Sequence, residues 1–152
     1  MSPDVSPDSY PNSGLLRRFA AMLYDGFLVV AIWMTSTTLL VALVTDGAEV
    51  MGLWYQVFLY LELAAFYIFF WRFKGQTLGM QVWKIQLVNN EGEFLSYKES
   101  LIRFITATLS VVFAGLGFVW MYFNEERLTI HDIVSKSHVM YLGKNPYRSE
   151  QA

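Results

Sequence analysis

The stretch FAAMLYDGFLVVAIWMTSTTLLVALV, from Phe19 to Val44, decides the class of this protein. Its 26 residues carry a single charge, Asp25. A helix of this length rises about 39 Å, which exceeds the roughly 30 Å hydrocarbon core of a lipid bilayer. The stretch therefore predicts a helix that crosses a membrane.

A second apolar run follows after a short polar loop. It extends from Gly52 to Trp71 with one charge, Glu62, and its length again suffices to cross a bilayer. Composition agrees, because 55% of the chain is apolar and 16% is charged, against about 45–50% and about 25% in soluble domains. We expect an all-α membrane protein with two membrane-spanning helices that contact the lipid bilayer.

The ends of the chain are polar, and its basic residues are placed unevenly. We expect a disordered tail at residues 1–14, a membrane domain at residues 15–142 and a second polar tail at residues 143–152. All eleven lysines and arginines lie outside the loop Thr45–Met51. Because basic loops stay in the cytoplasm, the N-terminus is expected there, and the protein in the cytoplasmic (inner) membrane of a bacterium.

The segment after the second run is too polar to span. Trp83–Val88 alternates as a strand does, Asn89–Gly92 supplies turn residues, and Phe94–Leu95 begins a return strand. This pattern predicts a small cytoplasmic β-hairpin. Ser96–Glu99 fits the S-x-x-E capping box, so a helix should begin at about Tyr97.

The uncharged run from Phe104 to Phe123 leaves two alternatives open. Its length permits a third full span. Its interruption at Ala114–Gly117 instead permits a re-entrant helical hairpin or an interfacial segment. A full crossing would carry Arg127 and Lys136 to the outside, against the rule that basic loops stay inside. We therefore favour the re-entrant or interfacial arrangement.

Two charged residues at the start of the first run lie on one helix face. Arg18 and Asp25 are seven residues apart, which places them about 10.5 Å apart along the axis. A carboxylate in the bilayer costs about 2.5–3.5 kcal/mol on insertion scales, so Asp25 requires a partner or a proton. Either it belongs to a buried pair that fixes helix packing, or it forms a cation or proton site.

Glu62 lies close to the centre of the second run, where no basic residue is near in sequence. Burial without a cation favours the neutral acid, and a hydrogen bond to the first helix, at Thr35 or Thr38, is the other structural interpretation. The functional alternative is an ion or proton relay through Asp25 and Glu62.

The sequence offers little for catalysis, metal binding or nucleic-acid binding. It has no cysteine, and His131 and His138 lack a third ligand at metal-binding spacing. A net charge of −2 gives no basic patch for nucleic acid. No nucleophile stands with a base and an orienting group. We expect no enzyme activity, no cofactor and no metal.

Three motifs occur in order along the chain. The first is Arg18–Asp25, at the start of the first run. The second reads G-x-T-x-G, at Gly75, Thr77 and Gly79, and the third is Ile130–Asp132. Together these motifs resemble the RDD family of small integral membrane proteins, which is named for one arginine and two aspartates. The resemblance assigns that charged triad to Arg18, Asp25 and Asp132.

The resemblance implies further contacts. Asp132 is expected to pair with Arg18 or with Arg103, and Arg103 and His131 are candidates for an ion pair on the cytoplasmic side. The two glycines of the junction motif would allow close approach of the backbone where the chain leaves the membrane. Members of the family are thought to act in transport of unidentified ligands, including cation–proton exchange.

Two functional hypotheses follow from this sequence. The first is a structural or accessory membrane component, whose charged triad fixes the helix bundle and which binds a membrane protein partner. The second is a small transporter of cations or protons that uses Asp25 and Glu62. Two or three spans enclose no pathway, so transport requires a homo-oligomer, for which Ala20, Ala21 and Gly26 offer small residues at a helix surface.

Overall fold

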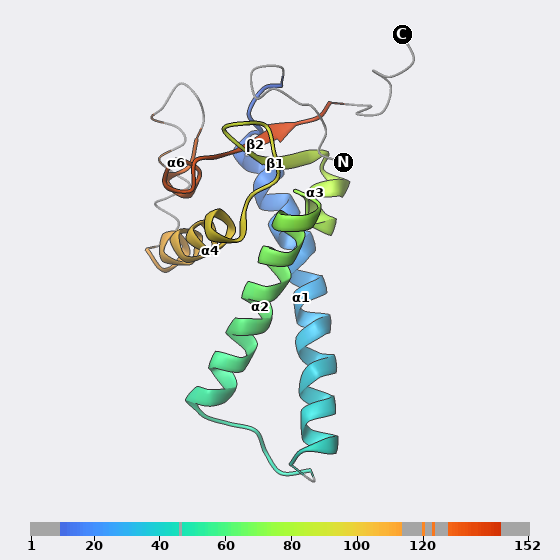
Figure 1. Cartoon of the computed structure of the whole chain (residues 1–152). Helices are drawn as coiled ribbons and strands as arrows, with labels where there is room; N and C mark the ends of the chain where they lie inside the picture. The colour runs from blue at the N-terminus through green and yellow to red at the C-terminus, as the bar shows by residue number, and fades with distance from the viewer. Residues whose placement is uncertain (1–9, 46, 114–119, 121–122, 124–127, 144–152) are drawn as a thin grey trace.

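Two long helices extend from one end of the molecule, and short helices and strands gather at that end (Figure 1). The structure is a computed structural model, and it describes residues 10–45, 47–113, 120, 123 and 128–143. Its elements are α1 (Leu15–Leu43), α2 (Leu53–Phe73), α3 (Leu78–Val82), β1 (Ile85–Asn89), α4 (Tyr97–Val112), α6 (Ile130–Val134) and β2 (Ser137–Tyr141). We call α3, β1, α6 and β2 together the cap.

Both predicted membrane helices are present. In the described part of the chain, α1 and α2 are the two helices that are long and apolar enough to cross a membrane. Only 6% of the most apolar stretch of each is buried, so their side chains face outward along most of their length. Hydrogen bonds nevertheless join the two helices at three levels. The bonded pairs are Trp33 with Leu59, Ser36 with Glu62, and Thr37 with Tyr55.

The cap contains the same short unit twice. In the first copy, Thr77 caps the five-residue helix α3, and Lys84, at a φ of 54°, leads into the five-residue strand β1. In the second copy, 52 residues later, Thr129 caps α6, and Lys136, at a φ of 50°, leads into β2. A non-glycine residue at positive φ is uncommon, so its recurrence at equivalent positions marks a genuine repeat of backbone geometry.

The two units meet through their strands, which pair antiparallel. Ile85 lies opposite Tyr141, and Asn89 lies opposite Ser137. At the centre of the ladder, Leu87 faces its own equivalent, Val139. This register relates the two units by a local pseudo-twofold axis.

The predicted β-hairpin is therefore wrong in its second strand. β1 lies within the region where a strand was expected, and the turn after it forms, because Asn89 Oδ1 accepts hydrogen bonds from the N–H groups of Glu91 and Glu93. However, Phe94–Leu95 is not a strand, and Leu95 is buried in the core instead. All of Ile85–Val88 is buried, so β1 needs a partner that is itself buried, and β2 provides it.

The N-terminal segment also joins this sheet. The N–H of Ser13 donates to the carbonyl of Val139 (2.7 Å), and the N–H of Tyr141 donates to the carbonyl of Pro11 (2.9 Å). Asn12 forms a bridge with Met140 between them. The expectation of disorder is thus wrong for Pro11–Ser13, because main-chain bonds, which the polar composition does not reveal, hold this segment in place. The first nine residues lie outside the described part.

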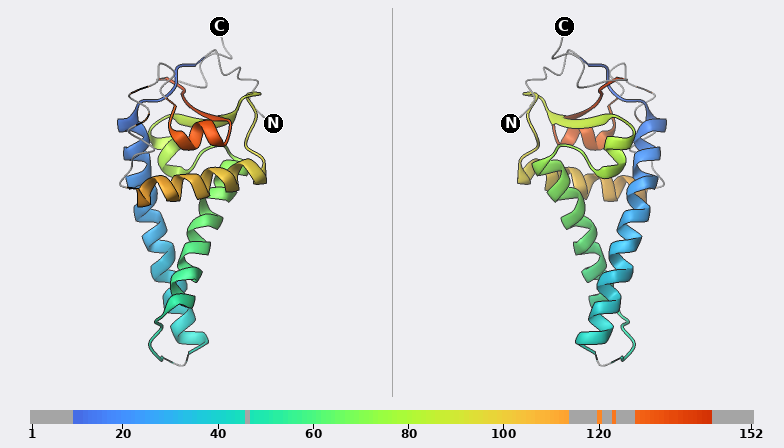
Figure 2. Two further views of the ribbon diagram at one scale, coloured as in Figure 1. Left: turned by 90° about the vertical axis from the view of Figure 1, so that its left-hand side faces the viewer. Right: turned by 90° about the vertical axis from the view of Figure 1, so that its right-hand side faces the viewer.

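Helix α4 begins at Tyr97 as predicted, with a complete capping box between Ser96 and Glu99. It lies crosswise to α1 and α2, beside the cap (Figure 2), and it ends at Val112. This segment therefore does not form one unbroken helix from Phe104 to Phe123. The interruption at Ala114–Gly117 lies outside the described residues.

The hydrophobic core lies where the cap, α4 and the near ends of α1 and α2 meet. Trp71 from α2 and Phe104 from α4 pack there with both strands. The buried members of this core are Ala21, Trp71, Met80, Ile85, Leu87, Leu95, Phe104 and Val139. The far halves of α1 and α2 contribute none of them, so the core fixes the cap end of the molecule.

Candidate functional site

One face of α1 is buried against the cap, and it carries two charges. The buried residues of α1 are Arg18, Ala21, Asp25 and Val29, spaced three or four apart as on one side of a helix. Arg18 contacts α6, and Asp25 contacts α3. Helix α1 therefore presents an arginine to α6 and an aspartate to α3.

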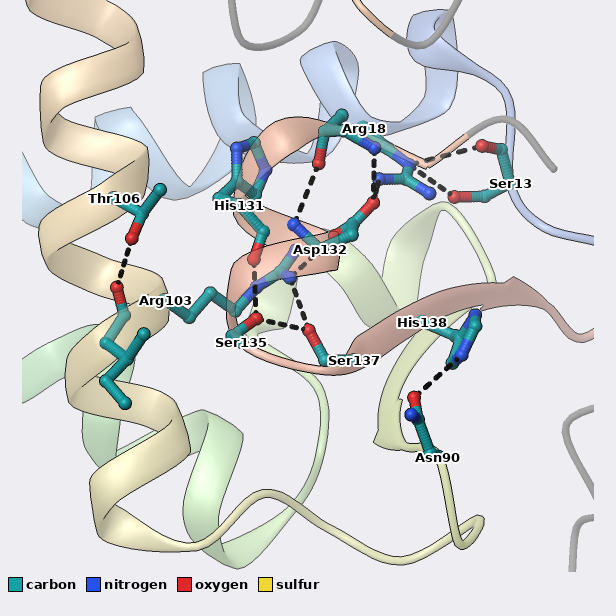
Figure 3. Close-up of polar contacts among 12 residues, drawn as sticks. Ser13, Arg18, Asn90, Arg103, Thr106, His131, Asp132, Ser135, Ser137 and His138 are labelled. Atoms are coloured by element: carbon teal, nitrogen blue, oxygen red, sulfur yellow. Dashed lines mark hydrogen bonds and ion pairs between the residues drawn. The ribbon is translucent and has the colours of Figure 1, made fainter. Parts of the chain in front are cut away.

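Asp132 is the centre of the basic side of the site (Figure 3). Arg18 Nη1 forms an ion pair with its Oδ2, and Arg103 Nη1 forms another with its Oδ1 at 2.6 Å. The carboxylate also accepts the N–H of Thr129 at 3.0 Å, which completes the capping box of α6. Asp132 is fully buried. One carboxylate thus joins α1, α4 and α6.

Serine side chains hold the two arginines in position. Arg18 Nε donates to both the carbonyl and the hydroxyl of Ser13, at 3.1 and 3.0 Å. Arg103 Nη1 donates to Ser137 Oγ at 2.7 Å. Ser137 in turn shares a hydrogen bond with Ser135. The arginines are therefore fixed by the N-terminal segment and by β2 as well as by Asp132.

The electrostatics of this cluster favour an ionised aspartate and a neutral histidine. Burial alone would raise the pKa of Asp132, but the positive charges of Arg103 and Arg18 hold it well below its usual range. Burial, together with the positive charge of the neighbouring Arg103, lowers the pKa of His131 to about 3. Burial also lowers the pKa of Arg103, against the opposing influence of Asp132. At neutral pH, His131 carries no charge.

Asp25 is bound by the start of α3. Thr77 Oγ1 donates to Asp25 Oδ2 at 2.5 Å, and the N–H of Gly79 donates to Asp25 Oδ1 at 2.8 Å. Asp25 is 2% exposed. A carboxylate at a helix N-terminus satisfies N–H groups that the helix itself leaves without acceptors. The junction motif is therefore the partner of this intramembrane acid.

Glycine is required at position 79 by the close approach of α1. A Cβ atom there would lie 2.2 Å from the carbonyl oxygen of Ala21 and 2.9 Å from Asp25 Oδ1. Gly75 is constrained differently, since its φ is +61° and a Cβ atom would lie 2.9 Å from the carbonyl oxygen of Leu87. Both glycines allow the close backbone approach that the sequence predicted, Gly79 toward α1 and Gly75 toward β1.

Comparison with known proteins matches these motifs to a family. The sequence matches the RDD family over residues 12–136, most of its length. The chain belongs to the RDD family. This is a family of membrane proteins, and α1 and α2, with their outward apolar side chains, are the candidate membrane-spanning helices of this RDD protein.

One curated relative of this RDD protein is an uncharacterized protein, YxaI, from Bacillus subtilis (strain 168). The two are 32% identical over 65 residues, which cover 43% of this chain and 42% of YxaI. The match thus spans less than half of that relative. No solved structure gives a significant match.

The sequence-predicted residues of this RDD protein form two groups in the structure. Arg18 and Arg103 meet at Asp132, so both pairs that the sequence offered as alternatives are present. Of the two ion-pair candidates, Arg103 pairs with Asp132, whereas His131 has its pKa lowered to about 3 and is neutral at pH 7. Asp25 joins the junction motif instead of Arg18.

The binding of Asp25 by Thr77 and Gly79 was not among the contacts predicted from the sequence. The signal was present, since a threonine before a short apolar stretch is a helix N-cap, and a helix N-terminus attracts a carboxylate. Glu62 accepts a hydrogen bond at 2.9 Å from Ser36, on the first helix as expected but not from either predicted threonine. Thr35 and Thr38 donate to carbonyls of their own helix.

Metal binding is not supported by the described residues. Among them, no group of three or more histidine, cysteine, aspartate or glutamate side chains is arranged to hold a metal ion.

Proposed function

We propose that this RDD protein is a structural or accessory component of a bacterial cytoplasmic membrane, in which the charged triad fixes the cap to the membrane helices. One observation carries this proposal. The buried carboxylate of Asp132 joins Arg18 of α1 to Arg103 of α4. Removing one partner of such a buried group typically costs about 3–5 kcal/mol, so the triad is suited to holding helices in one arrangement.

The internal partners of the triad support the same role. Asp25 is occupied by Thr77 and Gly79, and Asp132 is fully buried between its arginines. A catalytic acid or base must reach a substrate, whereas these carboxylates are buried and already bonded within the protein. We infer no enzymatic activity for this pair of aspartates.

The membrane helices provide a surface for a partner, either a second copy of this chain or another membrane protein. The outer side chains of α1 are apolar and exposed. At Gly26, a Cβ atom would meet nothing within 4 Å, so another helix has room to approach closely there. Small residues favour such contacts in membranes, where close packing rather than hydrophobic burial drives association.

The runner-up function is transport of cations or protons by an oligomer. It is favoured by the placement of two acids along the membrane helices, Asp25 on α1 and Glu62 on α2. Asp25 also lines a cavity of about 320 Å³. In this alternative, the hydrogen bonds from Ser36 to Glu62 and from Thr77 to Asp25 would break and re-form during each transport cycle.

A flux measurement separates the two functions. The purified protein is reconstituted into liposomes that contain a pH-sensitive dye, and a gradient of Na⁺ or K⁺ is imposed. The accessory role predicts proton movement equal to that of protein-free liposomes. Cation-driven flux that is lost in Asp25→Asn would overturn the accessory role in favour of transport, and Glu62→Gln would then show whether the second acid takes part.

A further inference from the structure

A cavity of about 320 Å³ lies between α1, α2, α4 and the cap. Its walls are apolar for most of their extent, with Ala21 and Met22 from α1, Leu63 and Tyr67 from α2, and Ala107 from α4. Pockets for small ligands typically measure about 300–1,000 Å³. This cavity is at the lower end of that range.

One end of the cavity is basic. Arg18 and Arg103 both line it, and each is only 5% exposed. Both arginines pair with the same carboxylate, Asp132. These three side chains together therefore carry a net charge of +1. His131, which also lines this end, is neutral at pH 7, since burial lowers its pKa to about 3.

The two arginines also have donors to spare. Among the described residues, Arg18 Nη2 and Arg103 Nε are buried and have no hydrogen-bond partner. A buried donor without an acceptor costs about 1–3 kcal/mol, more when it is charged. Asp25 lines the cavity too, but Thr77 and Gly79 already bind its carboxylate. An anion placed between the guanidinium groups would satisfy both free donors.

The other end of the cavity opens among exposed apolar side chains. Tyr60 of α2 and Val111 and Val112 of α4 line it, and all three are exposed. At the level of the bilayer, such an apolar opening would contact acyl chains. The cavity thus combines a basic inner end with an apolar mouth, which is the pattern that a lipid with a negative headgroup would match.

We propose that this cavity binds one single-chain anionic lipid, a fatty acid, with its carboxylate between Arg18 and Arg103 and its acyl chain along the apolar walls of α2 and α4. Guanidinium groups bind carboxylates through paired hydrogen bonds. The volume fits one chain better than the two chains of a phospholipid. The test separates this site from the structural role proposed above, because none of the variants used below changes Arg18, Arg103 or Asp132.

Quenching of tryptophan fluorescence tests this site, because Trp71 lines the cavity. Delipidated protein in a nonionic detergent is titrated with dibromostearic acid, whose bromine atoms quench nearby indole rings, and in parallel with its uncharged methyl ester. The acid should reach half-maximal quenching at a concentration at least about tenfold lower than the ester, as expected for one charged hydrogen bond. In Trp71→Phe, most of this difference should disappear.

Two variants of α4 serve as a matched pair. Ala107→Phe fills the cavity, whereas Ile105→Phe changes an exposed residue of the same helix that does not line it. The first should raise the concentration of acid needed about tenfold, and the second should leave it unchanged. Equal quenching by acid and ester in the wild-type protein would overturn the proposal, whether or not the variants fold. Quenching by a brominated anionic phospholipid but not by the fatty acid would overturn it as well.

Discussion

Asp132 is shared by two arginines, so the charges around it do not cancel in pairs. Removing its carboxylate leaves two buried guanidinium groups without an anion, whereas removing Arg18 leaves the neutral pair of Asp132 and Arg103. Loss of Asp132 should therefore reduce the stability of the protein more than loss of Arg18. The uncompensated charge also explains why the basic end of the cavity is suited to an anion.

We expect Asp132→Asn to destabilise the protein by about 3–5 kcal/mol, the usual cost of leaving a buried charge without its partner. Arg18→Gln should cost less, about 2 kcal/mol, for its lost charged hydrogen bonds. Thermal unfolding in mild detergent, followed as the fraction of monodisperse protein, measures both. An equal or larger loss in Arg18→Gln would contradict the shared arrangement.

His131 makes stability depend on pH. Its pKa is about 3 in the folded protein and about 6.5 when unfolded, so the unfolded chain binds the extra proton between these values. Stability must then fall as the pH is lowered through this window. From pH 7 to pH 5 we expect a loss of about 2 kcal/mol, because each pKa unit is worth about 1.4 kcal/mol.

The melting temperature at the two pH values measures this loss. His131→Asn should remove most of the difference between them. His138→Asn is the matched control, because His138 is half-buried beside Asn90 and contacts neither arginine. A difference that persists unchanged in His131→Asn would assign the pH dependence to another group.

At the scale of elements, α3 and α6 are equivalent units that α1 contacts through opposite charges. Asp25 meets the N-terminus of α3, and Arg18 meets an aspartate in the first turn of α6. The difference arises at one pair of equivalent positions, since Met80 stands in α3 where Asp132 stands in α6. The second unit, α6 with β2, already contains a carboxylate, Asp132. Its partner on α1 is therefore a cation, Arg18, rather than a second carboxylate.

Elements specified by local sequence were predictable, and contacts between distant segments were not. The S-x-x-E box fixes the start of α4 through hydrogen bonds within four residues, so Ser96 and Glu99 suffice to find it. The pairing of β1 with β2 joins residues 48 to 56 positions apart, and alternation in one strand does not identify the other. Likewise, the N-cap pattern at Thr77 indicates a place for a carboxylate but does not identify Asp25, because tertiary packing brings the two together.

The contact between α1 and α3 yields a prediction about two glycines. Gly79→Ala should destabilise the protein by about 3 kcal/mol, the upper range for overpacking, because its Cβ would lie 2.2 Å from a backbone oxygen. Gly26→Ala on α1 is the control, with nothing within 4 Å of its Cβ. It should be neutral or stabilise by up to about 1 kcal/mol. Thermal unfolding of both variants measures these changes in stability. Equal losses of stability would contradict the close contact between Gly79 and α1.

At the scale of the whole molecule, strand pairing restricts how the chain crosses the membrane. The segment Pro11–Ser13 precedes α1, and β1 follows soon after α2, yet both are joined to β2 in one sheet. A sheet of this size lies on one side of the bilayer. We therefore expect the chain between β1 and β2 to return to the side from which it leaves, which a single full crossing within residues 104–123 would not allow.

We predict that the C-terminus lies on the same side as the N-terminus, and the distribution of basic residues favours the cytoplasm as that side. Green fluorescent protein fused after Ala152 should therefore fluoresce, and alkaline phosphatase at the same position should be inactive. As a control, the same reporters inserted in the loop Thr45–Met51 should give the opposite pair of signals. An active phosphatase after Ala152 would mean that the chain crosses an odd number of times, and β2 would then be separated from β1 by the bilayer. Such a result would contradict the sheet itself, and with it the cap on which both Asp25 and Asp132 depend.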